Sequence, residues 1–128
     1  MGRKKIIRHV FRLHGFRDSL QFAAKGVLYL FLYHRNMRLI FLAGLIATIA
    51  GLFFQLTALE WAILCITITI VFVAEIFNTA IEMLMGMLKV KYYIRIKLIK
   101  DIAAAVVLLA SINAIIVGCI FFINRISR

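Results

Sequence analysis

The sequence predicts an all-α membrane protein, with one amphipathic helix at the membrane surface followed by three transmembrane helices. Three observations predict this class. Of the 128 residues, 65% are hydrophobic and the mean hydropathy is +1.04, whereas soluble domains are about half apolar. The chain contains no proline, and its charged residues gather between long apolar runs. Because no low-complexity linker interrupts it, we expect a single domain over residues 1–128.

The first expected element is an interfacial amphipathic helix at about residues 8–32. Its apolar residues recur at helical spacing, and arginines and lysines stand mostly between them. A helix of this kind lies in the membrane interface, with its cations near anionic headgroups. A cleavable signal peptide is the alternative, but no short apolar core with a small-residue cleavage site follows the basic start. We therefore expect the segment to stay in the mature protein.

Three apolar segments follow, at about residues 39–59, 61–88 and 102–123. Each has the roughly 20 residues that a helix needs to cross the hydrocarbon core of a bilayer. The second segment is longer than a bilayer requires, so we expect its end to extend into water.

The positive charges predict how these spans are oriented. Nine of the sixteen Lys and Arg lie before Leu39, and five more lie between Lys89 and Lys100. By the positive-inside rule, the amino terminus and the second link are cytoplasmic, and the carboxyl terminus faces outward. Arg125 and Arg128 argue the other way, but they are few. Nucleic-acid binding explains the charges less well, because they flank apolar spans instead of lining a soluble face.

The second span carries acidic and amide side chains on one helix face. Glu75, Asn78 and Glu82 lie within roughly 60° of one another at 100° per residue, and Thr79 shares their face. An ionisable group at membrane depth is costly unless it meets a partner, a cavity or a ligand. With the predicted orientation, Glu75 lies past the middle of the bilayer and Glu82 about 10 Å deeper, near cytoplasmic water. The face therefore predicts a functional site open to the cytoplasm.

A second group of charges lies at the cytoplasmic start of the third span. Lys100 and Asp101 stand there, after a basic link that contains Lys89, Lys91, Arg95 and Lys97. Carboxylates hold Mg²⁺ and cations bind polyphosphate, so these residues have the chemistry to bind a nucleoside triphosphate. The sequence has no glycine-rich Walker loop, which excludes the common P-loop kinases.

Two sequence elements together resemble a known family. The run Glu75-Ile76-Phe77-Asn78-Thr79-Ala80-Ile81-Glu82, followed by Lys100-Asp101-Ile102-Ala103-Ala104-Ala105, is similar to the signature of the prokaryotic diacylglycerol kinase and undecaprenol kinase family. The runs Lys25-Gly26-Val27, Arg35-Asn36-Met37-Arg38 and Gln55-Leu56-Thr57-Ala58-Leu59-Glu60-Trp61 resemble the undecaprenol kinase branch. The likeness covers about Phe16 to Phe122.

The resemblance implies a homotrimeric lipid kinase of the bacterial inner membrane, with active sites shared between neighbouring subunits near the cytoplasmic surface. Such an enzyme transfers phosphate directly from Mg·ATP to the hydroxyl of a membrane lipid. The implied cofactors are ATP and Mg²⁺, and no nucleic acid takes part. Undecaprenol is favoured over diacylglycerol as the acceptor because of the run Arg35 to Arg38.

The resemblance also implies roles for single residues. Glu75 matches the general base and Asn78 a catalytic residue beside it, whereas Glu82 matches a metal-binding carboxylate. Lys100, Asp101 and Lys25 match residues that bind the nucleotide.

Two positions depart from the family pattern. His34 stands where the family has a glutamate that is a second metal ligand, and imidazole suits Mg²⁺ less well than a carboxylate. Gly86 stands where the family tends to have an aspartate. These departures motivate an alternative, a degenerate member that acts as a lipid-binding or structural trimer.

An ion-coupled transporter is a further alternative. A proton relay would explain Glu75 and Glu82, but not Lys100 and Asp101 at their fixed distance. Cys65 and Cys119 are expected to be small buried hydrophobic residues, although a disulfide between them is conceivable.

Overall fold

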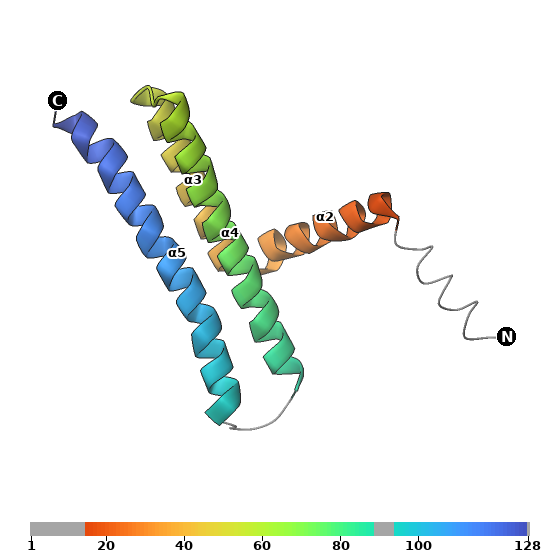
Figure 1. Ribbon diagram of the computed structural model, residues 1–128. Helices are drawn as coiled ribbons and strands as arrows, with labels where there is room; N and C mark the ends of the chain where they lie inside the picture. Colours follow the sequence, from red (N-terminus) through yellow and green to blue (C-terminus); the bar gives the residue numbers. More distant parts are fainter. Residues whose placement is uncertain (1–14, 89–93, 128) are drawn as a thin grey trace. The chain divides into compact units, whose positions relative to one another are not determined.

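The computed structural model describes residues 15–88 and 94–127, which form four helices. These are α2 (Phe16–Tyr33), α3 (Arg35–Phe53), α4 (Ala58–Met87) and α5 (Ile94–Ile126), as Figure 1 shows. The chain divides near residue 35 into two compact units, and each is described by itself. Helices α3, α4 and α5 are long and apolar enough to cross a membrane. The predicted all-α fold with three such helices is confirmed, whereas the interfacial helix and the trimer stay predictions.

Helix α2 belongs to the first unit. Its first turn contains Asp18, whose negative charge is favourable at a helix amino terminus. The helix ends at His34, where the backbone becomes extended and the N–H donates to the Leu30 carbonyl at 2.9 Å. Apolar side chains such as Phe16 and Leu20 are exposed in this unit. Residues 8–14 of the predicted amphipathic helix lie outside the described residues.

A tight turn joins α3 to α4. Gln55 adopts a φ of 54°, in the left-handed region that non-glycine residues seldom occupy. Thr57 and Glu60 then form a capping box, in which each side chain accepts a hydrogen bond from the other's backbone N–H. The first apolar segment was expected to continue to about residue 59, but α3 ends at Phe53 because the chain reverses here. We call the end of the bundle that contains this turn the turn end.

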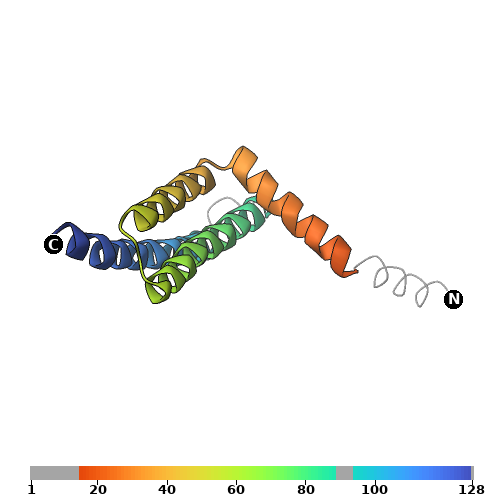
Figure 2. The same cartoon turned by 90° about the horizontal axis from the view of Figure 1, so that it is seen from above.

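Two glycines of α3 leave room for neighbouring side chains of α4 and the turn before it; α4 lies beside α3 in Figure 2. A Cβ atom at Gly51 would lie 2.8 Å from Cη2 of Trp61 and 3.0 Å from Cδ1 of Leu56. A Cβ atom at Gly44 would lie 3.3 Å from Cγ2 of Ile68. Small residues serve this purpose at helix contacts inside membranes.

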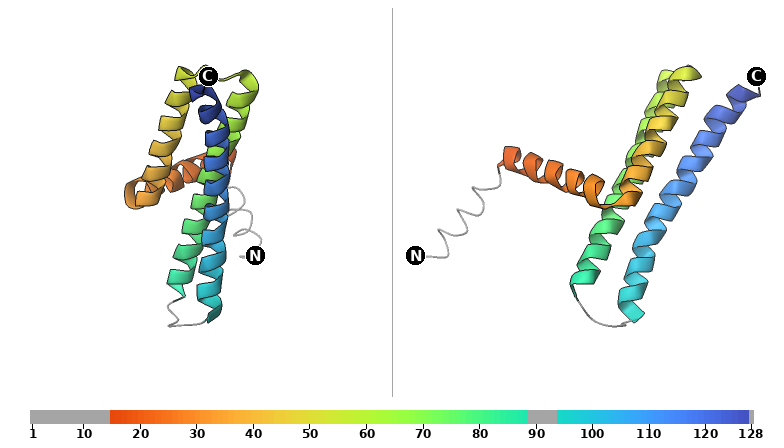
Figure 3. Two further views of the ribbon diagram at one scale, coloured as in Figure 1. Left: turned by 90° about the vertical axis from the view of Figure 1, so that its left-hand side faces the viewer. Right: turned by 180° about the vertical axis from the view of Figure 1, so that it is seen from behind.

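Helices α4 and α5 lie side by side and antiparallel, as Figures 1 and 3 show. Along α5, the small residues Ala103 and Ala110 are buried. Helix α5 begins at Ile94, eight residues before the predicted span. Charged residues such as Lys97 are good helix formers, so hydropathy marks the membrane-crossing part and not the helix end. We call the end where α4 stops and α5 begins the hairpin end.

Candidate active site

A buried polar face runs along the second half of α4. Glu75 is 4% exposed, Asn78 is 7% exposed and Thr79 is 2% exposed. Their spacing of three and four residues brings them to one side of the helix, next to the buried Ala74. The structure therefore places the carboxylate and the amide that the sequence singled out together, inside an otherwise apolar helix.

The hydrogen bonds of this face are incomplete within the described parts of the chain. The Thr79 hydroxyl donates to Oε1 of Glu75 at 3.4 Å. Oδ1 of Asn78 is buried and accepts no hydrogen bond from any residue in 15–88 or 94–127. A buried acceptor without a donor costs about 1–3 kcal/mol and is uncommon in folded proteins. Oδ1 of Asn78 therefore keeps an unused capacity to accept a hydrogen bond within the described part of the chain.

Glu82 lies further along α4 and is exposed. One helical turn beyond it is Gly86, where an added Cβ atom would meet no atom within 4 Å. A carboxylate at position 86 would therefore fit, one turn from that of Glu82. The paired acids that the family pattern expects have space here, but this chain supplies only the first of them.

The antiparallel register brings Lys100 and Asp101 to the same end of the bundle as Glu82. Val71 of α4 and Ser111 of α5 line the same space. Glu82 lies eleven residues after Val71, and Lys100 lies eleven residues before Ser111, so both are about 16 Å further toward the hairpin end. Lys100 and Asp101 are exposed, two turns inside α5 and not at its start.

The remaining predicted site residues belong to the first unit. Lys25 is exposed on α2. His34 is half-buried, and its ring centre lies 6.0 Å from that of Tyr29. That Lys25 and His34 share a nucleotide and metal site with Glu82 stays a prediction. Lys89 and Lys91 of the basic link lie outside the described residues.

The metal prediction was tested against the acidic, histidine and cysteine side chains of the described chain. Within residues 15–88 and 94–127, no three of these residues come together to hold a metal ion. Magnesium does not require such a cluster, because it commonly takes one or two carboxylates, several waters and the phosphates of a substrate. A single accessible carboxylate at Glu82 fits Mg²⁺ bound together with a nucleotide, but not a metal held by the protein alone.

Sequence reasoning missed an interaction at the turn end. Arg125 donates to Oε2 of Glu60 at 2.5 Å and to the carbonyl oxygens of Phe54 and Gln55. Glu60 is 65 residues earlier in the chain, so no local pattern could pair the two. The sequence contained one signal for this pair. The link between the first two spans has an acid, Glu60, but no cation, and the last span ends on the same side of the membrane with Arg125. The bond ties α5 to the turn between α3 and α4.

The two cysteines differ from their prediction. Cys65 and Cys119 are both free and both exposed on the single chain, not buried. Each is exposed on the surface of its helix, where a small apolar side chain is compatible with lipid.

Comparisons with known proteins identify the family of the chain. The family described as prokaryotic diacylglycerol kinase matches residues 21–122. Over 101 residues, or 78% of the chain, it is 37% identical to a diacylglycerol kinase from Synechocystis sp., and it spans only 58% of that protein. It is 28% identical to an undecaprenol kinase from Bacillus subtilis over 92% of the chain and 96% of that protein. The chain therefore belongs to the prokaryotic diacylglycerol kinase family, and the names of these relatives indicate a lipid kinase.

Proposed function

We propose that this chain transfers the γ-phosphate of Mg·ATP directly to the hydroxyl of a membrane lipid alcohol. The observation that carries the proposal is the buried pair Glu75 and Asn78, with an unpartnered amide oxygen in an apolar helix. The names of the two relatives, diacylglycerol kinase and undecaprenol kinase, support a lipid acceptor. We favour undecaprenol because of the run Arg35 to Arg38, with diacylglycerol as the other acceptor.

The acceptor side of the reaction belongs to α4. Asn78 orients the lipid hydroxyl by donating from its amide Nδ2–H to the hydroxyl oxygen, which leaves the single hydroxyl proton for Glu75. Glu75, three residues earlier, takes the hydroxyl proton as the oxygen bonds to the γ-phosphorus and the bond from that phosphorus to ADP breaks. The Thr79 hydroxyl holds the Glu75 carboxylate by donating to Oε1. A positioned general base of this kind contributes about 10²–10⁴ to the rate.

The nucleotide side belongs to the hairpin end. Glu82 would hold Mg²⁺ together with the ATP phosphates, and the metal supplies positive charge to the phosphate oxygens. Lys100, Asp101 and Lys25 would bind the nucleotide. His34 is the candidate for a second metal ligand.

The same proposal places the hairpin end and the amino terminus in the cytoplasm of a bacterial inner membrane, with the carboxyl terminus outward. The excess of Lys and Arg before Leu39 and near Lys100 supports this orientation. Arg125, which argued against it, is paired with Glu60, so less of its charge opposes export. A homotrimer with shared sites is supported by the resemblance and by the exposed apolar side chains along α3, α4 and α5.

The test uses the purified protein in mixed micelles with ATP labelled at the γ-phosphate. Undecaprenol and diacylglycerol are offered in separate reactions. We expect label in at least one lipid, and we expect Glu75→Gln to abolish it. Transfer to neither lipid would refute the proposal, and unchanged transfer in Glu75→Gln would refute the assignment of the base.

A degenerate, lipid-binding or structural trimer is the alternative, and it is motivated by His34 and Gly86. The open space at Gly86 makes this alternative testable by restoring acids. If the native chain is inactive and His34→Glu or Gly86→Asp gains transfer, the chain has lost metal ligands and the alternative is correct. If the native chain is active, neither restoration is needed and the alternative fails.

A further inference from the structure

Helix α5 carries an exposed amide at the middle of its apolar part. Asn113 lies eleven residues after Ile102 and ten before Ile123, and it is exposed on the single chain. Its side chain forms no hydrogen bond with any residue in 15–88 or 94–127. An amide has two donor hydrogens and an acceptor oxygen, and hydrocarbon tails offer a partner to neither. Asn113 therefore calls for a polar partner that the single chain does not supply.

Helix α4 carries an exposed hydroxyl on its own outer surface. Thr69 is exposed, and its hydroxyl donates to the Cys65 carbonyl of the same helix at 2.8 Å. This bond uses the only hydrogen of the hydroxyl, so the lone pairs of Oγ1 stay able to accept a hydrogen bond. The amide hydrogens of Asn113 are donors, so the two exposed groups are chemically complementary.

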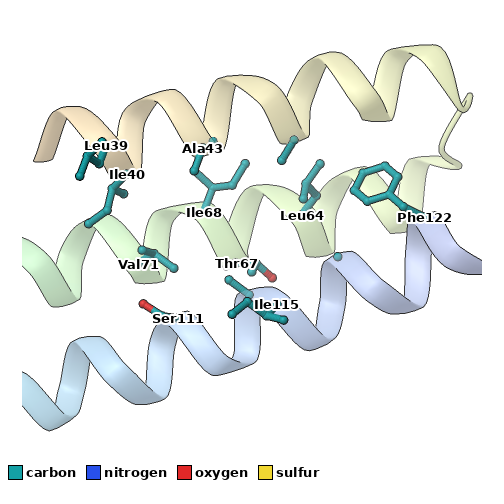
Figure 4. Close-up of a pocket in the computed structure, with 14 residues that line it drawn as sticks. Leu39, Ile40, Ala43, Leu64, Thr67, Ile68, Val71, Ser111, Ile115 and Phe122 are labelled. Carbon is teal, nitrogen blue, oxygen red and sulfur yellow. The ribbon is translucent and has the colours of Figure 1, made fainter. Parts of the chain in front are cut away.

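Thr69 and Asn113 lie at the same level along the bundle. Val71 of α4 and Ser111 of α5 line one pocket, and Figure 4 shows them next to each other. Thr69 comes two residues before Val71, and Asn113 comes two residues after Ser111. Because the helices are antiparallel, both are about 3 Å further toward the turn end. Copies of one chain insert in one orientation, so Asn113 of one copy is level with Thr69 of another.

The shapes of the two surfaces are complementary as well. Ala62 and Cys65 share a helix face with Thr69 and are also exposed, so this side of α4 carries small side chains. Leu109 and Ile116 are large, exposed, and about one turn to either side of Asn113. Small residues let a second helix approach closely inside a membrane, whereas two α5 helices would hold each other apart with branched side chains. The surface of α5 therefore fits α4 of another copy better than a second α5.

We propose that the surface of α5 around Asn113 packs on the surface of α4 around Thr69 in the next copy of the chain, with Nδ2 of Asn113 donating to Oγ1 of Thr69. Each copy gives one surface and receives the other, and such a head-to-tail contact closes into a ring when the rotation between copies allows it. The inference rests on the homotrimer of the proposed function and extends it, because it names the two surfaces that meet.

The first experiment is disulfide cross-linking in native membranes, in a chain whose own cysteines are removed by Cys65→Ala and Cys119→Ala. A disulfide forms when two Cα atoms lie about 4.4–6.8 Å apart. We expect the chain with Thr69→Cys and Asn113→Cys to give dimers and larger species on oxidation. In the matched control, Ile115→Cys replaces Asn113→Cys. Ile115 is 66% exposed and only about 3 Å further along α5, but it lies about 200° around the helix.

Three outcomes of the cross-linking would overturn the inference. Cross-linked dimers from Asn113→Cys without Thr69→Cys would show that two α5 helices meet. An equal yield from the Ile115→Cys control would mean that copies collide without a fixed contact. A lack of cross-links in the chain with both cysteines would mean that the two surfaces do not meet.

The second experiment leaves the native cysteines in place. Association of fluorescently labelled copies is measured by energy transfer in lipid vesicles, as the protein is diluted with lipid. Asn113→Leu and Thr69→Val should each weaken association about threefold per contact, and together no more than either alone. Thr48→Val is the control, because Thr48 makes the same bond to the carbonyl four residues earlier, at 2.8 Å, on a half-buried surface of α3. Additive losses in the double variant would overturn the pairing.

Both experiments measure association, so their failure differs from a failure of the kinase. Cross-links between Thr69→Cys and Asn113→Cys, with phosphate transfer to neither lipid by the native chain, would refute the proposed reaction and keep the contact. Phosphate transfer by the native chain, without these cross-links, would refute the contact and keep the reaction.

Discussion

Replacing three glycines by alanine should change the stability of the bundle by different amounts, and the differences test how α3 packs against α4. A Cβ atom added at Gly51 meets Cη2 of Trp61 at 2.8 Å and Cδ1 of Leu56 at 3.0 Å, distances that ordinary contacts do not reach. Leu56 is buried, and the indole ring is rigid, so neither side chain moves away without disturbing the turn. Overpacking of this kind costs about 1–3 kcal/mol. We therefore expect Gly51→Ala to destabilise the bundle by that amount relative to a matched glycine.

Gly118 is the matched glycine, because it also lies inside a helix and its Cβ atom would meet nothing within 4 Å. Gly118→Ala should be neutral, or more stable by up to about 1 kcal/mol from helix propensity. Gly44→Ala should fall between the two, because its Cβ atom would lie 3.3 Å from one methyl group of Ile68.

The assay is equilibrium unfolding in mixed micelles as the fraction of sodium dodecyl sulphate rises. Trp61 is the single tryptophan of the chain and lies at the substituted contact, so its fluorescence reports this part of the structure. Unfolding of Gly51→Ala at a lower detergent fraction than Gly118→Ala is the expected result. Equal midpoints for these two variants would show that α3 does not approach α4 closely at Gly51.

Three further predictions concern the two ends of the bundle and the buried polar face of α4. Glu82→Gln should raise the Mg²⁺ concentration for half-maximal transfer at least about tenfold, about 1.4 kcal/mol, with little change in lipid KM; an unchanged Mg²⁺ titration would remove Glu82 from the metal site. Arg125→Ala, Glu60→Ala and the double variant should give a coupling energy of about 0.5–3 kcal/mol in detergent unfolding, and additive losses would mean that the ion pair stabilises nothing. Thr79→Val keeps the side-chain shape but removes the donor to Glu75, so kcat should fall by less than about tenfold because the bond is long at 3.4 Å. A loss as large as that in Glu75→Gln would show that the hydroxyl takes part in the reaction itself.

The sequence predicted the elements of this protein that depend on local periodicity. Long apolar runs predicted three helices able to cross a membrane because a bilayer requires that length. Residues three, four and seven apart share a helix face, so the spacing alone predicted that Glu75, Asn78 and Thr79 lie together. Hydropathy was a poorer guide to helix ends. Helix α3 ends because the chain reverses at Gln55 and the capping box of Thr57 starts the next helix. Helix α5 begins among charged residues that lie before the apolar, membrane-crossing part of the helix.

What only the tertiary structure decided were relations between residues far apart in the chain. Arg125 reaches Glu60 and the turn before it because α5 returns antiparallel to α4, and that register also brings Lys100 level with Glu82. The sequence showed that α4 carries costly polar groups. The structure showed that Oδ1 of Asn78 is buried without a donor in the described chain, because burial depends on packing between residues far apart in the sequence.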